Sequence, residues 1–130
     1  MKIKKSLLAA FALGIFAVPY VAQAADGNWK KGRIYYRMVC TACHVDQPSG
    51  SIAPSTMTIA EWKAYIEADK HAKGADKLSY YTSKEYRTKI KDSNKAAASL
   101  IDVPNDELLA DVKAFVIHGA KDSDNPARCN

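Results

Sequence analysis

Apolar residues occur first as one short block and then as stripes with helical spacing. The block covers residues 7–18, follows three lysines within the first five residues, and precedes a small-residue sequence that ends at Ala24. A charged start, a short apolar run and an A-x-A sequence are typical of a secretory signal peptide. A membrane anchor is the alternative, but the block is short and Gly14 and Pro19 interrupt it. We expect residues 1–24 to be removed, releasing residues 25–130 into the periplasm without stable membrane insertion.

The clearest stripe lies near the C-terminus. Its apolar residues follow the i, i+3, i+4, i+7 spacing of a helix face and are Leu108, Leu109, Val112, Phe115 and Val116. Pro104 and then Asn105 precede the stripe, which predicts a helix with Asn105 as its N-cap. Gly119 is the expected end of that helix.

The middle of the chain predicts further helices. Thr58 and Glu61 form a capping box, and the helix that begins there should run to about Lys70. On that helix one face carries Trp62, Tyr65 and Ile66. A second helix should follow Ser83 and include the apolar run 96–100, whereas residues 73–82 read as a loop. With no internal repeat, residues 25–130 are expected to form one all-α domain.

Charge changes this picture little. The whole chain has a formal net charge of +5, but three of its basic residues lie in the predicted signal peptide, so the mature charge is +2. Nucleic-acid binding therefore has little support. Residues 63–95 are rich in lysine and residues 101–130 are rich in acids, which predicts one positive and one negative end. The lysine-rich 63–95 region is a candidate docking surface for an acidic partner, or simply the solvated side of helices.

Three cysteines give the strongest chemical signal. Cys40, Cys43 and His44 form a C-x-x-C-H sequence, in which two thiols bind the haem vinyl groups as thioethers and the imidazole binds iron. A thioredoxin-like pair would need a βαβ pattern, and a zinc site would need a second ligand pair; neither pattern is present. The sequence therefore predicts one covalent haem c. Cys129 is then an odd thiol on a loose terminal tail, and we assign it no function.

The flanks of this motif resemble class I cytochromes c. Gly32 lies eight residues before Cys40 and Tyr36 lies four before it. In that family a small residue and an aromatic at these spacings belong to the first helix and cross the C-terminal helix, so the resemblance implies a helix here. The resemblance covers residues 29–44 and 104–119 and implies a small all-α, cytochrome c-like domain wrapped around one haem. It also implies an exported electron carrier that works with redox partner proteins. Nothing resembles the acid-base set of an enzyme.

The resemblance is incomplete in one respect, because the sequence lacks the family's usual second axial ligand of the iron. Class I proteins usually supply a methionine before the last helix, but residues 72–103 contain neither Met nor His. His71, at the end of the helix begun at Thr58, is the preferred candidate. Met57 is the second choice, although a hydrophobic staple with Trp62 also explains it. A lysine, His118 or an open position are the other possibilities, and an open position would favour a small-ligand sensor or a peroxidase-like protein.

Pro54 and the tyrosine pair are two further features of the middle region. Pro54 resembles the family's proline on the proximal side, whose carbonyl orients the iron-binding histidine. Tyr80 and Tyr81 could bond a haem propionate, but simple surface packing is the more economical interpretation.

Overall fold

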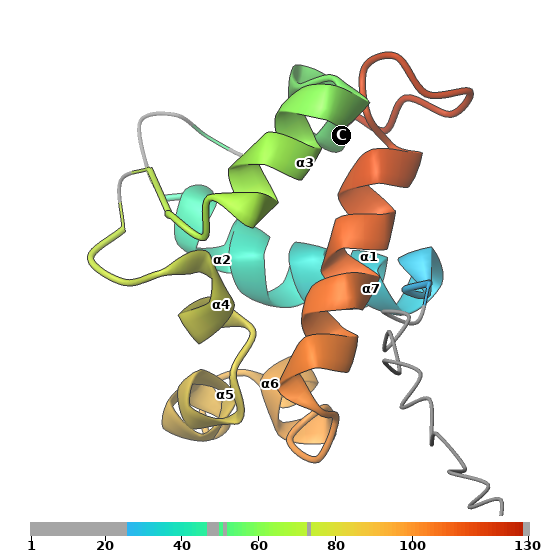
Figure 1. The fold of residues 1–130 in the computed structure, drawn as a ribbon. Helices are drawn as coiled ribbons and strands as arrows, with labels where there is room; N and C mark the ends of the chain where they lie inside the picture. Colours follow the sequence, from blue (N-terminus) through green and yellow to red (C-terminus); the bar gives the residue numbers. More distant parts are fainter. Residues whose placement is uncertain (1–25, 47–49, 51, 73, 129–130) are drawn as a thin grey trace, which may run out of the picture.

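The computed structural model describes residues 26–46, 50, 52–72 and 74–128 (Figure 1). The regular structure of this part of the chain is helical, with no strand, which confirms the all-α prediction. The predicted signal peptide and Cys129 lie outside the described residues. Across the ranges given, no helix is long and apolar enough to span a membrane.

The first helical stretch changes type along its length. α1 (Trp29–Tyr35) begins at Asn28, whose side chain accepts the backbone N–H groups of Lys30 and Lys31. It continues as the π-helix η1 (Tyr36–Cys40) and then as α2 (Thr41–His44). The Thr41 N–H and hydroxyl both donate to the Tyr36 carbonyl, five residues back. The sequence predicted this stretch as helix but not its π segment.

α7 (Asn105–His118) is the longest helix described and runs across α1 (Figure 1). Most of its predicted stripe is buried, and Leu109 is half-buried. It ends at Gly119 as expected, but Asn105 is its first helical residue rather than its N-cap, which is Pro104. The Asn105 side chain accepts the Lys84 N–H at 2.7 Å instead. The predicted cap is therefore wrong because Asn105 binds a neighbouring helix.

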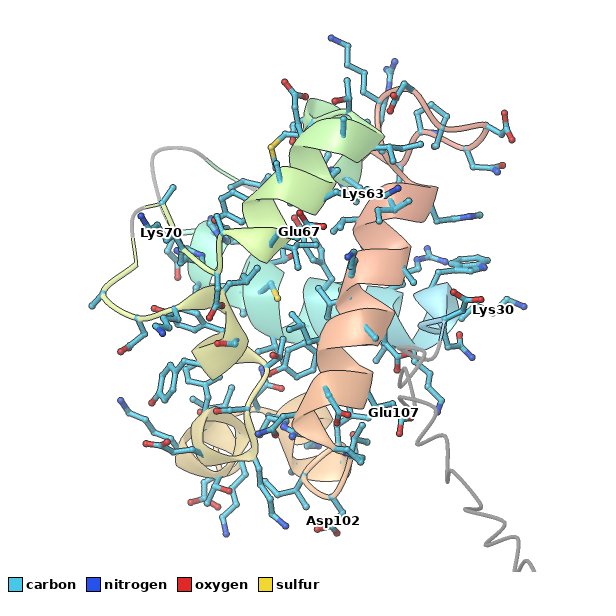
Figure 2. The ribbon with its side chains drawn as sticks, viewed as in Figure 1. Lys30, Lys63, Glu67, Lys70, Asp102 and Glu107 are labelled. Carbon is cyan, nitrogen blue, oxygen red and sulfur yellow. The ribbon has the colours of Figure 1, made fainter. Side chains whose placement is uncertain are left out.

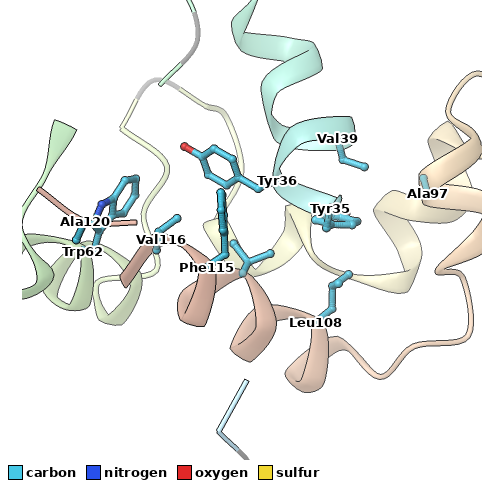
Figure 3. Packing of buried hydrophobic residues seen from close by; sticks show 10 residues of the cluster. Tyr35, Tyr36, Val39, Trp62, Ala97, Leu108, Phe115, Val116 and Ala120 are labelled. Atoms are coloured by element: carbon cyan, nitrogen blue, oxygen red, sulfur yellow. The ribbon is translucent and has the colours of Figure 1, made fainter. Parts of the chain in front are cut away.

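α1 and α7 cross where the sequence predicted. A Cβ added to Gly32 would lie 1.9 Å from the Asp111 carbonyl oxygen, so only a glycine allows this approach. Beside the crossing, the rings of Tyr36 and Phe115 are 5.3 Å apart (Figure 3). The buried core extends from this point to Trp62 and Ala97. The two ends of the domain thus form most of its core.

α3 (Ile59–Glu67) packs on α7 next to the short 3-10 helix η2 (Pro54–Thr56). Its capping box is confirmed, with the Thr58 hydroxyl and the Glu61 carboxylate each accepting from the other's backbone. Trp62 is buried and donates its ring N–H to the Pro54 carbonyl at 2.7 Å. The helix ends before the predicted Lys70, because the chain turns at Asp69 with a φ of 48°.

Three short helices complete the lower part of Figure 1. α5 (Lys84–Ile90) begins at Ser83 as predicted, and α6 (Lys95–Ser99) is separate from it. α4 (Leu78–Tyr81) lies in the segment predicted to be loop. Arg87 is fully buried and donates to the carbonyls of Ser83, Leu100 and Val103. This guanidinium joins α5 to the chain that leads into α7.

The C-terminal segment, expected to be loose, is bound to the start of α3. The Lys121 N–H donates to the Met57 carbonyl at 2.9 Å, and the Ser55 N–H donates to the Ala127 carbonyl at 3.1 Å. The Asp122 carboxylate accepts the Ile59 N–H at 2.7 Å. These hydrogen bonds hold the segment against the start of α3. The prediction of a loose tail is therefore wrong for the part up to Ala127.

The basic and acidic parts of the chain are not separated into two ends. Lys63 and Lys70 lie at the α3 side, far from Asp102 (Figure 2). However, Lys84 of the lysine-rich region pairs with Asp102 at 3.1 Å. The predicted segregation of charge is therefore wrong, since α5 brings lysines next to the acidic segment.

Candidate functional site

The C-x-x-C-H residues lie at the end of the first helical stretch. Cys40 closes the π-helix and is half-buried, whereas Cys43 is exposed on α2. The two cysteines are not joined in a disulfide. His44 is the last residue of α2 and is half-buried. One helical turn thus carries both thiols and an imidazole.

Burial dominates the electrostatics of Cys40. It raises the pKa of the Cys40 thiol to about 12, and the neighbouring Cys43 adds to the shift. A reactive cysteine of a thioredoxin-like pair has a lowered pKa, because the thiolate is the attacking species. The environment of Cys40 does not match that type of site.

His71 lies in a loop whose two ends are tied together. The Asp69 carboxylate accepts the Ser79 N–H at 2.7 Å and the Ser79 hydroxyl at 2.8 Å. These bonds hold the pKa of Asp69 below its ordinary value. Within the loop, the Ala72 N–H donates to the Tyr65 hydroxyl at 3.3 Å. These bonds hold both ends of the loop and the residue next to His71.

This loop brings His71 beside His44. Their ring centroids are 5.8 Å apart and their planes differ by 30°. An imidazole nitrogen binds a transition metal at about 2.0–2.1 Å, so two rings on opposite sides of one ion have centroids about 6 Å apart. The separation between His44 and His71 is close to that value.

The ring nitrogens of the two imidazoles also suit the binding of one metal ion between the rings. Nδ1 of His44 and Nδ1 of His71 are both buried and have no hydrogen-bond partner among the described residues. Burial and the neighbouring His44 lower the pKa of His71, which favours its neutral form. The expected role of the Pro54 carbonyl toward His44 is not seen, because that carbonyl accepts the Trp62 ring N–H.

A cluster of tyrosine rings contacts His71 through Tyr81. The Tyr81 ring lies 5.0 Å from the His71 ring and contacts both Tyr80 and Tyr86 edge to face. The Tyr86 hydroxyl lies 3.9 Å from the Cys43 sulfur. Tyr35 donates its hydroxyl to the Tyr81 carbonyl at 2.5 Å. Tyr80 and Tyr81 therefore pack within a half-buried cluster of tyrosine rings.

A β-carbon would not fit at Gly74. It would lie 2.7 Å from Nδ1 of His71 and 2.8 Å from the Tyr81 hydroxyl. Gly74 does not stop the helix begun at Thr58, which already ends at Glu67. Gly74 instead leaves room for the His71 ring.

The site residues could hold a covalent haem, which needs fewer protein ligands than a structural metal ion. No group of three or more His, Cys, Asp or Glu side chains gathers around a possible metal position in the described ranges. A structural zinc site needs four such ligands. A haem needs only the two thiols, His44 and one further ligand, because its own nitrogens hold the iron.

The other candidate ligands have different surroundings. Met57 packs against the hydrophobic core. The His118 ring stacks on Trp29 at 4.2 Å with an angle of 13°. Both positions have a structural explanation of their own.

No protein family, curated protein or solved structure matches this chain. The assignment of the site therefore depends on its own residues. Sequence reasoning named Cys40, Cys43, His44 and His71 as its members. It missed the supports of His71, namely Asp69, Ser79 and the tyrosine cluster, for which the only signal was a run of aromatic and short polar residues around the loop.

Proposed function

We propose that this chain is an exported mono-haem c-type cytochrome that transfers electrons. The observation that carries the proposal is the 5.8 Å separation of His44 and His71 next to the two thiols of a C-x-x-C-H sequence. When bound, the haem supplies an iron that cycles between the ferric and ferrous states.

The residues of the chain have separate roles in this proposal. Cys40 and Cys43 attach the haem covalently, and His44 is the proximal ligand. His71 is the distal ligand, held by the Asp69–Ser79 pair and by Tyr81. Two fixed imidazoles suit electron transfer, because neither ligand has to leave or enter when the charge changes.

A matched pair of variants tests the distal ligand. His71→Ala should convert the ferric protein from low spin to high spin in its EPR and optical spectra, whereas Met57→Leu should leave both spectra unchanged. An unchanged spectrum in His71→Ala, or a thioether-to-iron charge-transfer band in the wild type, would point to Met57. Stoichiometric carbon monoxide binding by the ferrous wild type would instead favour a sensor or a peroxidase-like protein.

Attachment and export have a separate test. Haem should stay with the chain after acid-acetone extraction and should be lost in a Cys40→Ala, Cys43→Ala variant. The periplasmic protein should have a mass that begins at Ala25. A full-length holoprotein in the cytoplasm would contradict the proposal.

We also propose that an acidic redox partner docks on the lysine-rich 63–95 region. The lysines of the α5–α6 part, Lys84, Lys89, Lys91 and Lys95, are all exposed. The electron-transfer rate with the physiological partner should fall as salt is added. Lys89→Glu with Lys91→Glu should lower that rate, whereas Lys121→Glu, outside the region, should not.

A further inference from the structure

The Tyr86 hydroxyl lies next to the attachment motif. Its oxygen is 3.9 Å from the Cys43 sulfur, within hydrogen-bond reach of this large atom. A tyrosine O–H is the stronger donor of the two groups, whereas a cysteine sulfur is a weak donor and a weak acceptor. A thioether has no hydrogen to donate, so the hydroxyl can donate both to the thiol and to the thioether that replaces it. The contact therefore suits Cys43 before and after haem attachment.

Other contacts hold Tyr86 independently of Cys43. Its backbone N–H donates to the Ser83 hydroxyl at 3.1 Å, which is the N-cap bond of α5. Its ring meets the rings of Tyr80 and Tyr81 edge to face, with centroids 5.5 Å and 5.2 Å away. Tyr86 is half-buried, whereas Cys43 is exposed. The tyrosine is thus the fixed member of the pair, and the cysteine is the one that can move.

The packing of the tyrosine cluster does not require the Tyr86 hydroxyl. A phenylalanine ring would make the same edge-to-face contacts. A half-buried hydroxyl gives up hydrogen bonds to water, which is unfavourable unless another group accepts its proton. Burial, and then the hydrogen bond with Cys43, raise the pKa of Tyr86, so the hydroxyl keeps its proton at neutral pH. The Cys43 sulfur therefore explains why a hydroxyl is present here.

The two cysteines of the motif differ in how their side chains are held. Cys40 is half-buried, ends the π-helix and packs against the hydrophobic core. The Cys43 side chain is exposed on α2, where a cysteine can adopt several staggered rotamers. A hydrogen bond from Tyr86 selects the rotamer that directs the sulfur toward α5. Cys43 thus depends on an outside residue for its orientation, whereas Cys40 does not.

We propose that Tyr86 is a positioning residue that holds the Cys43 sulfur for its thioether bond to haem. In this step the sulfur bonds one carbon of a vinyl group and the thiol proton passes to the other carbon, so no electron is gained or lost. Tyr86 keeps its own proton and only orients the sulfur. The inference rests on the proposed function and adds to it a residue outside the C-x-x-C-H motif.

Holo-protein isolated from cells tests this role in the wild type and two variants. Tyr86→Phe keeps the ring contacts and removes the hydroxyl. Tyr80→Phe, the matched control, removes a hydroxyl from a neighbouring ring of the same cluster. The pyridine haemochrome band reports the number of thioether bonds, because each vinyl group that remains shifts it. Alkylation followed by peptide mass spectrometry identifies the cysteine that is left free.

We expect the ratio of singly to doubly attached chains to rise about 2- to 10-fold in Tyr86→Phe, the range that one net hydrogen bond gives. The free thiol should be Cys43, and Tyr80→Phe should match the wild type. Doubly attached Tyr86→Phe should stay low spin in ferric EPR, since the Tyr81 ring still contacts His71. An unchanged ratio, or equal loss of attachment at Cys40 and Cys43, would overturn the inference.

A second measurement needs no variant. In the diamagnetic ferrous wild type, the Tyr86 hydroxyl proton should exchange slowly with water and show a nuclear Overhauser contact with the Cβ protons of Cys43. The absence of this contact would overturn the inference. A wild type without covalent haem refutes the proposed function itself. A wild type with two thioether bonds and no effect of Tyr86→Phe refutes only the positioning role.

Discussion

Replacing Gly74 with alanine should move His71 without unfolding the protein. The new methyl carbon would lie 2.7 Å from Nδ1 and 3.0 Å from Cγ of the His71 ring. Ordinary contacts between such atoms are about 3.5–4.0 Å, so the ring must retreat by nearly 1 Å. Gly74 itself does not have a positive φ, so alanine can adopt its backbone conformation.

The size of this movement decides which property changes. The atoms in conflict are the outer parts of the His71 and Tyr81 side chains, which can rotate, so the apoprotein should lose less than about 1 kcal/mol of unfolding free energy. A metal–imidazole bond of about 2.0–2.1 Å cannot lengthen by nearly 1 Å and remain a bond. The holoprotein should therefore lose its distal ligand or bind it weakly.

Ferric EPR, optical spectra and urea titration of Gly74→Ala together check this expectation. We expect a large high-spin fraction and carbon monoxide binding by the ferrous form, with nearly unchanged unfolding of the apoprotein. Ala75→Ser, a small change at the exposed neighbouring residue, is the control and should behave as wild type. A fully low-spin Gly74→Ala protein would refute the assignment of His71.

Three further substitutions test the supports of the fold. Arg87→Met should lower the unfolding free energy by at least about 3 kcal/mol in urea titration, because it leaves several buried acceptors unpaired. Gly32→Ala should cost about 3 kcal/mol in the same assay, since its Cβ meets backbone that cannot rotate away. For Asp69, hydrogen bonds from Ser79 lower the folded-state pKa, so their stabilisation is complete above the ordinary pKa and is lost as the pH falls through the folded value. Asp69→Asn should therefore flatten the acid part of the stability profile; a profile identical to wild type would contradict this reasoning.

The sequence predicted those parts of the fold that depend on local patterns. The capping box at Thr58 and the Ser83 cap were correct, because each depends on a few neighbouring residues. The crossing of Gly32 over α7 was also correct, although it came from a resemblance and not from periodicity. Asn105 shows the limit of local rules: it has the ideal composition for an N-cap, but its side chain is used by Lys84 and Arg87.

The candidate site was predictable to a lesser degree. Cys40, Cys43 and His44 belong to one short motif, whereas the position of His71 depends on contacts across the loop. The left-handed turn at Asp69 and its bonds to Ser79 position the loop that carries His71. No periodic pattern of apolar residues in the sequence predicts either feature. The short helix α4 was missed because only four residues form it, too few for a repeating pattern.

The π-helix between Tyr36 and Cys40 has a consequence for how related sequences would have to be compared. A π segment contains one residue more than an α-helix of the same turns, and each added residue rotates the later part of the helix by about 100°. Gly32, before the π segment, contacts α7 in one helical frame, and His44, after it, lies beside His71 in another. A relative with an uninterrupted α-helix here would need a one-residue gap between these two frames. Aligned without that gap, either its crossing residues or its attachment motif would match this chain, but not both.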